Sequence, residues 1–184
     1  MNEKGQIIVI SGPSGAGKNT VFDALNAVMD DVVQTVSVTT RKPRDGEVDG
    51  VDYYFVTKEE FADKIQADEF VEYVQYGENY YGTLKSEIHQ LVASGKKVIL
   101  VIEVNGAFNI KREFPESKTI FIIPPSLEVL RERISGRGQN SEHETELRLR
   151  IAVEELKQKD KYDYCVINDE LDACVDEIYR IINE

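Results

Sequence analysis

The chain has 184 residues, which is enough for one α/β core and too few for two independent domains of ordinary size. Its formal net charge is -12, from 34 acidic and 22 basic residues. This charge argues against nucleic acid or a membrane surface as the main partner, because both favour a basic face. The first apolar run is too short for a signal peptide or a membrane span, so we expect a cytoplasmic protein that binds small molecules.

Short apolar runs alternate with amphipathic stretches along the chain, a pattern typical of an open parallel sheet with helices on both faces. The predicted core strands are 6–11, 32–37, 97–102, 118–123 and 163–167. The predicted core helices are 18–29, 84–94, 105–113 and 170–183. Ser126 is expected to cap a further helix, which contains Leu127, Leu130 and Ile134.

The first strand leads directly into a glycine-rich turn followed by a helix, the context of a phosphate-binding loop. Glycines allow successive backbone N–H groups to point inward, and the following helix presents its positive dipole end to the same place. Lys18 adds a mobile charge that can reach the β- and γ-phosphates of a nucleotide. The alternative is an ordinary glycine-rich strand-to-helix turn. The residues predicted to bind the nucleotide are Gly12, Pro13, Ser14, Gly15, Ala16, Gly17, Lys18, Asn19 and Thr20.

One position in this loop is unusual. Asn19 stands where a hydroxyl residue normally ligates Mg²⁺, and Thr20 follows one place later. An amide oxygen can bind a hard cation directly or through water, so we predict a Mg²⁺ site that includes Asn19.

Two segments depart from the simple alternation. In 38–83, Asp45-Gly46 and Asp49-Gly50 predict tight turns, and 53–56 and 70–74 have the composition of strands. We expect a small, partly antiparallel insertion there. Segment 126–160 is a charged helical stretch interrupted by glycines, a pattern that fits a mobile lid and a plain solvated helical hairpin equally well.

Six stretches carry a family pattern: 12–18 (GPSGAGK), 37–47 (SVTTRKPRDGE), 50–53 (GVDY), 79–83 (NYYGT), 136–138 (GRG) and 166–169 (VIND). On these stretches the sequence resembles the guanylate kinases over about residues 5–183. The resemblance implies a P-loop kinase core in which helices flank a parallel sheet, formed by 1–36, 84–125 and 161–184. It also implies a small mixed α/β GMP-binding insertion at 37–83 and a helical lid at 126–160.

The resemblance further implies an enzyme that transfers the γ-phosphoryl group of ATP to GMP or dGMP with Mg²⁺, as a monomer or a homodimer. Arg41 and Arg44 would hold the GMP phosphate, assisted by the hydroxyls of Tyr53 and Tyr81. Arginine suits this task because its planar fork meets phosphate oxygens bidentately. A surface salt bridge in an acidic chain is the alternative for either arginine.

Side chains from the insertion would recognise the guanine ring by hydrogen bonds. Glu72 occupies the family's position for a carboxylate that accepts from the N1–H and 2-amino donors, while Ser37 and Thr83 offer hydroxyls to the remaining ring atoms. Adenine presents the opposite pattern and would be rejected. Because Glu72 lies in an alternating strand, an outward-facing, solvated acid is the alternative. By resemblance, Glu103 also faces GMP.

Arg137 and Arg148 correspond to lid arginines that would close over the transferring group together with Lys18 and Arg41, and Arg133 can assist them. Salt bridges within the charged helix, to Glu142, Glu144 or Glu146, are the alternative for Arg148. Asn168 corresponds to a residue near the adenine of ATP.

Three places depart from the family pattern. Asn19 is the first, and Gln139-Asn140 replaces a Thr-acid pair. The third is Val101-Ile102-Glu103, where the family has two acids one residue apart. Val101 removes an acid that would order Mg²⁺, so we expect slow turnover or an altered metal preference. Two other functions stay open: a guanylate-kinase-like binding module with weak or no catalysis, and a P-loop kinase for another small phosphate.

Overall fold

A computed structural model describes residues 5–136 and 141–184. Its centre is a sheet of five parallel strands in the order β2-β7-β1-β8-β9. The strands are β1 (Gln6–Ser11), β2 (Val32–Gln34), β7 (Lys97–Val101), β8 (Lys118–Ile123) and β9 (Tyr164–Ile167). Because the strands are parallel, Gly12 after β1, Ile102 after β7 and Asn168 after β9 emerge at the same edge of the sheet.

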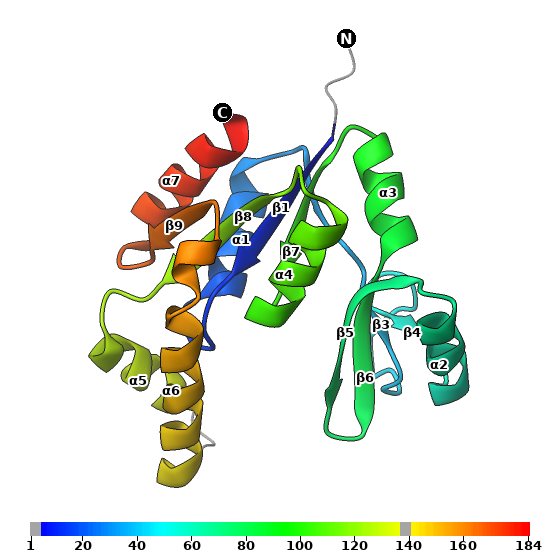
Figure 1. Ribbon diagram of the computed structural model, residues 1–184, viewed down its shortest axis with the longest axis horizontal. Coiled ribbons are helices and arrows are strands. Elements are labelled where there is room, and N and C mark those ends of the chain that lie inside the picture. Colours follow the sequence, from blue (N-terminus) through cyan, green and yellow to red (C-terminus); the bar gives the residue numbers. More distant parts are fainter. Residues whose placement is uncertain (1–4, 137–140) are drawn as a thin grey trace.

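Helices cover both faces of this sheet (Figure 1). The core helices are α1 (Lys18–Val28), α3 (Lys85–Ala93), α4 (Val104–Glu113) and α7 (Leu171–Asn183). In β1, Ile8 and Ile10 pack with α1 and α7, whereas Ile7 and Val9 pack with α3 and α4. Burial on both faces explains why this strand is a continuous apolar run. The predicted α/β class is confirmed, and each predicted core strand and helix has a counterpart in the structure, although one strand is shorter than predicted.

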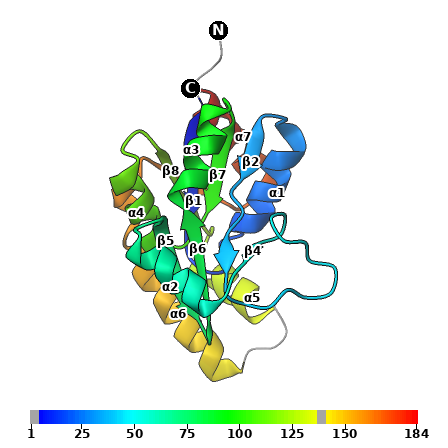
Figure 2. The same cartoon turned by 90° about the vertical axis from the view of Figure 1, so that its right-hand side faces the viewer.

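The insertion forms a second, four-stranded sheet in the order β4-β3-β6-β5 (Figure 2). Its strands are β3 (Val38–Thr39), β4 (Tyr54–Phe55), β5 (Phe70–Tyr76) and β6 (Asn79–Leu84). β3 runs parallel to β4, and the other two pairs are antiparallel. The predicted strand 32–37 was too long, because the chain leaves the first sheet after Gln34 and enters the second at Val38.

Helix α2 (Lys58–Gln66) covers the second sheet and was missed by the sequence analysis. Its Phe61 stacks on Phe70 with the ring centroids 4.4 Å apart. The signal for this helix was a capping box, in which Thr57 accepts from the N–H of Glu60 and the Glu60 carboxylate accepts from the N–H of Thr57.

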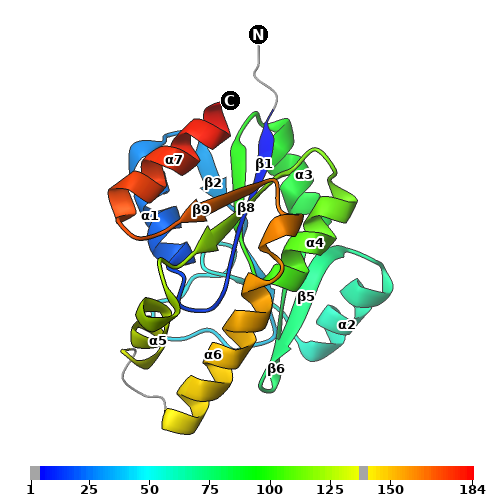
Figure 3. The same ribbon diagram turned by 60° about the vertical axis from the view of Figure 1, so that its left-hand side comes forward.

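Helices α5 (Leu127–Ser135) and α6 (Glu142–Leu156) lie side by side beyond the carboxyl ends of the strands (Figure 3). The Ser126 hydroxyl accepts a hydrogen bond from the N–H of Val129, which confirms the predicted cap. Leu130, Ile134 and Ala152 form a small apolar cluster between the helices. A 3₁₀ turn, η1 (Lys159–Lys161), leads from α6 back to β9. None of the helices in the described ranges is long and apolar enough to cross a membrane.

Candidate nucleotide site

The phosphate loop connects β1 to α1 at the carboxyl edge of the central sheet. Gly17 is the N-cap of α1 with φ 91°, a left-handed conformation, and a β-carbon there would collide with the Asn168 side-chain amide. No side chain caps the first turn of α1 and no acid lies in it. Its backbone N–H groups are therefore open to an anion.

Lys18 is folded over this loop. Its Nζ donates to the carbonyl oxygen of Gly12 at 2.6 Å and lies 3.4 Å from Glu103 Oε1. The lysine borders a small cavity of about 120 Å³, the phosphate-loop cavity. Its lining residues are Pro13, Ser14, Gly15, Gly17, Lys18, Asn19 and Glu103. Gly12 and Ala16, two of the predicted nucleotide-binding residues, are buried. Thr20 lines a neighbouring cavity.

The phosphate-loop cavity has donors of the kind that Mg²⁺ uses. Asn19 and Glu103 both line it, and they carry an amide oxygen and a carboxylate, respectively. Within the described residues, no group of three or more His, Cys, Asp or Glu could hold a metal ion by itself. Mg²⁺ is commonly bound through one or two carboxylates plus substrate phosphates and waters. The residues present therefore fit an ion that arrives with a nucleotide.

Asn168 holds the phosphate loop in place. Its Nδ2 donates to the Ala16 carbonyl oxygen at 2.8 Å, and its backbone N–H donates to the Ile123 carbonyl oxygen at 2.8 Å. The side chain is buried, so its amide nitrogen is committed to the loop. It also borders a cavity of about 470 Å³, the Asn168 cavity, with Gly15, Gly17, Thr20, Arg133, Gly136, Asp169 and Leu171.

A third cavity, the Glu72 cavity, has a volume of about 350 Å³ and lies between the insertion and α4. It brings together Ser37, Glu72, Thr83 and Glu103, four residues that the sequence analysis placed in one site. The Thr83 hydroxyl donates to Glu72 Oε1 at 2.8 Å. Burial raises the pKa of Glu72, and this hydrogen bond opposes the shift. The outward-facing alternative for Glu72 is therefore wrong.

Helix α4 supplies lining residues that the sequence analysis missed. Asn105 and Asn109 border the Glu72 cavity, together with Tyr73, Val74, Val101, Ile102 and Gly106. The two asparagines are four residues apart and so share one face of the helix, which was the signal available in the sequence. A β-carbon at Gly106 would lie 3.4 Å from Glu72 Oε2, so α4 packs closely against this carboxylate.

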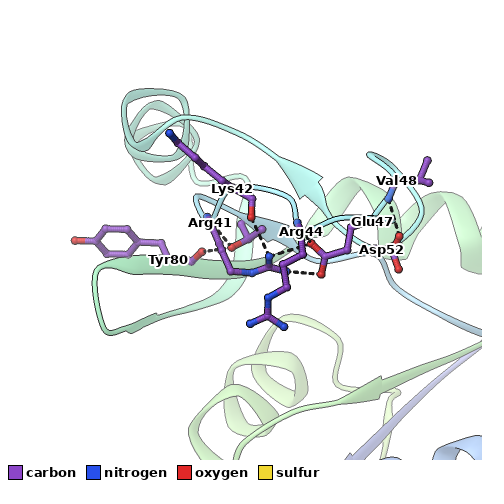
Figure 4. Close-up of polar contacts among 8 residues, drawn as sticks. Arg41, Lys42, Arg44, Glu47, Val48, Asp52 and Tyr80 are labelled. Atoms are coloured by element: carbon purple, nitrogen blue, oxygen red, sulfur yellow. Dashed lines mark hydrogen bonds and ion pairs between the residues drawn. The ribbon is translucent and has the colours of Figure 1, made fainter.

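Arg41 is held by a carboxylate of its own loop (Figure 4). Its Nη1 and Nη2 donate to the two oxygens of Glu47 at 2.9 and 2.7 Å, and the same carboxylate accepts from the Arg44 N–H at 2.7 Å. The guanidinium lies 5.3 Å from the centroid of the Tyr53 ring. The hydrogen bond from Arg41 is the main reason why the pKa of Glu47 falls to about 2. Arg41 thus forms a salt bridge with Glu47, which is what the alternative interpretation of this arginine expected. Its guanidinium nevertheless lies beside Tyr53.

Arg44 contrasts with Arg41. Its side chain is exposed, and within the described residues its guanidinium makes no hydrogen bond or ion pair (Figure 4). The rings of Tyr53 and Tyr81 are 6.1 Å apart edge to face, and Tyr81 is among the weaker causes that raise the pKa of Arg41, after Glu47. The structure therefore groups Arg41, Tyr53 and Tyr81.

The predicted lid arginines are only partly described. Arg148 lies on α6, half-buried, and no ion pair joins it to another described residue. Glu146 instead lies 3.5 Å from Arg131 and 3.8 Å from Arg150. Arg133 Nη2 donates to the Asn168 carbonyl oxygen at 3.1 Å. Arg137, Gln139 and Asn140 lie outside the described residues.

Comparison with known proteins identifies the family of this chain. The family model described as guanylate kinase matches residues 4–184. A guanylate kinase of Halalkalibacterium halodurans is 47% identical over 180 residues, which are 98% of this chain and 88% of that protein. The crystal structure of guanylate kinase from Anaplasma phagocytophilum has a TM-score of 0.73 at 33% identity and covers 98% of this chain and 86% of that one.

A more distant structure, shikimate kinase from Bacteroides thetaiotaomicron, has a TM-score of 0.52 at 15% identity and covers 97% of this chain and 99% of that one. That similarity concerns the P-loop kinase fold alone. The family model, the relative and the Anaplasma structure together confirm the resemblance: this chain belongs to the guanylate kinase family.

Proposed function

We propose that this chain transfers the γ-phosphoryl group of ATP to GMP or dGMP and releases ADP and GDP or dGDP. The observation that carries this proposal is the position of Glu103, which lines both the phosphate-loop cavity and the Glu72 cavity. A nucleotide phosphate in the first cavity therefore lies next to an acceptor in the second. Such adjacency is the main requirement of phosphoryl transfer, which depends on positioning and charge stabilisation.

The donor end would bind ATP through backbone groups. The free N–H groups of the loop and of the first turn of α1 would hold the phosphates. Lys18 would exchange its bond to the Gly12 carbonyl oxygen for phosphate oxygens. The Asn168 cavity, with Arg133 at its edge, would take the adenosine part.

The acceptor end would bind GMP through side chains. Because the Thr83 hydroxyl already donates to Glu72, it offers only lone pairs to the base. The Glu72 carboxylate would accept from N1–H and the 2-amino group, and the Ser37 hydroxyl is left to donate to O6. Arg44, Tyr53, Tyr81 and the remaining N–H groups of Arg41 would hold the phosphate.

The transfer step would place positive charge around the moving phosphoryl group. Lys18, Arg41 and Arg148 supply it from three elements, and Arg137 is expected to add to it. Asn19 and Glu103 would hold the Mg²⁺ that enters with ATP, and this ion would add charge neutralisation at the phosphates. Segments 37–83 and 126–160 are proposed to close toward each other and exclude water.

The test is a coupled assay of ADP formation with ATP, Mg²⁺ and a panel of GMP, dGMP, AMP, CMP and UMP. We expect turnover with GMP and dGMP, and rates at least about a hundredfold lower with the other three, because a buried acid left unpaired rejects adenine. GMP binding without GMP-dependent ADP formation would instead identify a binding module. Turnover with another small phosphate but not with GMP would show that the base assignment is wrong.

Several expectations remain predictions. They are a cytoplasmic location, the absence of nucleic-acid and membrane partners, and a monomeric or homodimeric state. Gel filtration with light scattering would decide the last of these.

A further inference from the structure

The chain passes between the two sheets twice, and one hydrogen bond joins the two crossings. The first crossing is the irregular segment 35–37, between β2 and β3, and the second is the junction of β6 with α3 (Figure 1). Glu87 lies in the first turn of α3, and its Oε1 accepts a hydrogen bond from the backbone N–H of Val36 at 2.6 Å. The two residues are 51 positions apart, so the bond connects segments that are distant in the chain.

This hydrogen bond lies next to a residue of the Glu72 cavity. Ser37 follows Val36 directly and lines that cavity. The Ser37 carbonyl oxygen also accepts a hydrogen bond from the N–H of Tyr54 at 2.9 Å. The backbone is thus held one residue before Ser37 by α3 and at Ser37 itself by β4. These two bonds flank the hydroxyl that is proposed to donate to guanine O6.

The start of α3 is itself joined to the insertion. Lys85, the first residue of the helix, pairs through its Nζ with Asp68 at 2.8 Å. Thr83 lies two residues before Lys85, near the end of β6, and lines the same cavity as Ser37. Glu87 therefore connects the segment that contains Ser37 with the segment that contains Thr83.

The Glu87 carboxylate has few other polar contacts. The residue is half-buried, and its Oε2 is buried without a hydrogen-bond partner among the described residues. Burial raises the pKa of Glu87, and the hydrogen bond from the Val36 N–H opposes this shift. A hydrogen bond from a backbone N–H to a carboxylate is charge-assisted and is therefore stronger than one between neutral groups. Such a bond can restrict the movement of segment 35–37.

We propose that Glu87 is a positioning residue of the acceptor end, which holds segment 35–37 so that the Ser37 hydroxyl faces the guanine ring. The proposal rests on the proposed function in taking GMP as the ligand. It goes beyond that function because Glu87 does not line the Glu72 cavity and acts only through the backbone next to Ser37.

The test is a double-mutant cycle between Glu87 and Ser37. Equilibrium binding of GMP, without ATP, is measured for Glu87→Ala, Ser37→Ala and the double variant. We expect Glu87→Ala to weaken GMP binding by about three- to tenfold, at most the loss of one hydrogen bond. In the Ser37→Ala background the same change should weaken binding by less than about twofold, because the residue through which Glu87 acts has already lost its hydroxyl.

Two matched variants and two further readouts separate positioning from a general loss of stability. Glu87→Gln keeps an acceptor oxygen for Val36 and should bind GMP within about twofold of the parent. Gln90→Ala changes an exposed residue of the same helix and should match the parent. ATP binding, measured with EDTA, should be unchanged in every variant. The Val36 amide proton, followed by NMR in the unliganded protein, should move upfield in Glu87→Ala and stay in place in Gln90→Ala.

Three results would overturn the proposal. They are equal effects of Glu87→Ala in the two backgrounds, equal losses of GMP and ATP affinity, and GMP binding by Glu87→Ala that matches the Gln90→Ala control. If Glu87→Ala does not fold, Glu87→Asp replaces it in the cycle, because the shorter side chain keeps the charge and withdraws the acceptor. The same coupling is then expected, and its absence would be equally decisive.

None of these measurements requires phosphorylation of GMP. A parent protein that binds GMP while the cycle shows no coupling would refute the positioning role and leave the proposed activity intact. Failure of the proposed activity is detected separately, by the substrate panel.

Discussion

The two ends of the site are built in different ways. The donor end is one contiguous loop, 12–19, whose groups for an anion are mainly backbone N–H donors and one lysine. The acceptor end collects side chains from separate stretches of the insertion and from α4 of the core. The residues proposed for the acceptor are Ser37, Arg41, Arg44, Tyr53, Glu72, Tyr81 and Thr83, and Asn105 and Asn109 also line the Glu72 cavity.

This difference predicts different responses to substitution. A backbone-built site depends on the few residues that shape the backbone or carry the charge, so most side-chain changes there should be mild. A site built from side chains loses one specific contact with each change. The donor end should therefore fail in the chemical step, and the acceptor end should fail in GMP binding or in the choice of base.

The largest effect is expected at Lys18. Lys18→Ala removes the mobile charge of the phosphate loop and should lower kcat by about 10²–10³-fold, the usual cost of one donor to developing charge. GMP affinity should stay within about twofold of the parent, and thermal unfolding would verify the fold. A similar change in GMP affinity would mean that the two ends are not independent.

A smaller loss is expected for Glu72→Gln. The amide cannot accept from both guanine donors, so kcat/KM for GMP should fall by about a hundredfold while KM for ATP holds. A higher KM for ATP in Glu72→Gln would contradict the expected separation between the donor end and the acceptor end. Thr83→Val, which removes the hydroxyl that donates to Glu72, is a milder companion variant.

Glu72→Gln also tests how the stability of the protein depends on pH. Burial raises the pKa of Glu72 above its ordinary value of 4.5 in the unliganded protein. The protonated form is thus favoured, and the stability that it contributes is lost as pH rises from the ordinary value through the raised one. Glu72→Gln stays neutral, so at pH 7 its Tm should equal or exceed that of the parent. A Tm that falls at pH 7 but not at pH 4 would contradict this.

Arg44→Ala should raise KM for GMP by about ten- to a hundredfold, which corresponds to one or two lost charge-assisted hydrogen bonds. Because its guanidinium makes no hydrogen bond or ion pair with another described residue, stability should not change. Lys42→Ala, exposed in the same loop, is the matched control and should leave KM unchanged. If Lys42→Ala raised KM for GMP as much as Arg44→Ala, the loop would attract GMP through its overall positive charge rather than through a specific contact with the phosphate.

The smallest effect is expected for Glu47→Gln. This carboxylate orients Arg41 through a partly buried ion pair, and glutamine keeps one acceptor oxygen, so the change should raise KM for GMP only about two- to fivefold, as for one weakened hydrogen bond. Its pKa of about 2 lies below the ordinary value of 4.5, so the contribution is present above that value and is lost as pH falls toward 2. KM measured from pH 5 to 8 should therefore show no step from this pair.

Particular residues show how far the sequence could lead. The phosphate loop and the five core strands were predictable because their signals are local: an apolar run, then glycines and a lysine. Glu72 was placed in the right cavity only through its family resemblance, since an alternating strand has two faces and the pattern does not say which one is covered. Helix α2 was missed although its capping box was visible.

Other features depended on how separate parts of the chain fold together. The bidentate pair between Arg41 and Glu47 depends on how the loop turns back on itself. The hydrogen bond from the Tyr162 hydroxyl to Ser11 Oγ, just before the phosphate loop, joins residues that lie 151 positions apart. Asn105 and Asn109 enter the site because α4 packs against β5, which brings a core helix to the base pocket.

The sequence by itself determined the class of the fold and the position of the phosphate loop, because both depend on interactions among residues close in the chain. The tertiary structure decided which side chains line the Glu72 cavity and that Glu103 borders both this cavity and the phosphate-loop cavity. The physical reason is that a helix, a strand or a glycine loop is specified by neighbours in the chain, whereas a cavity forms only where separate elements pack together.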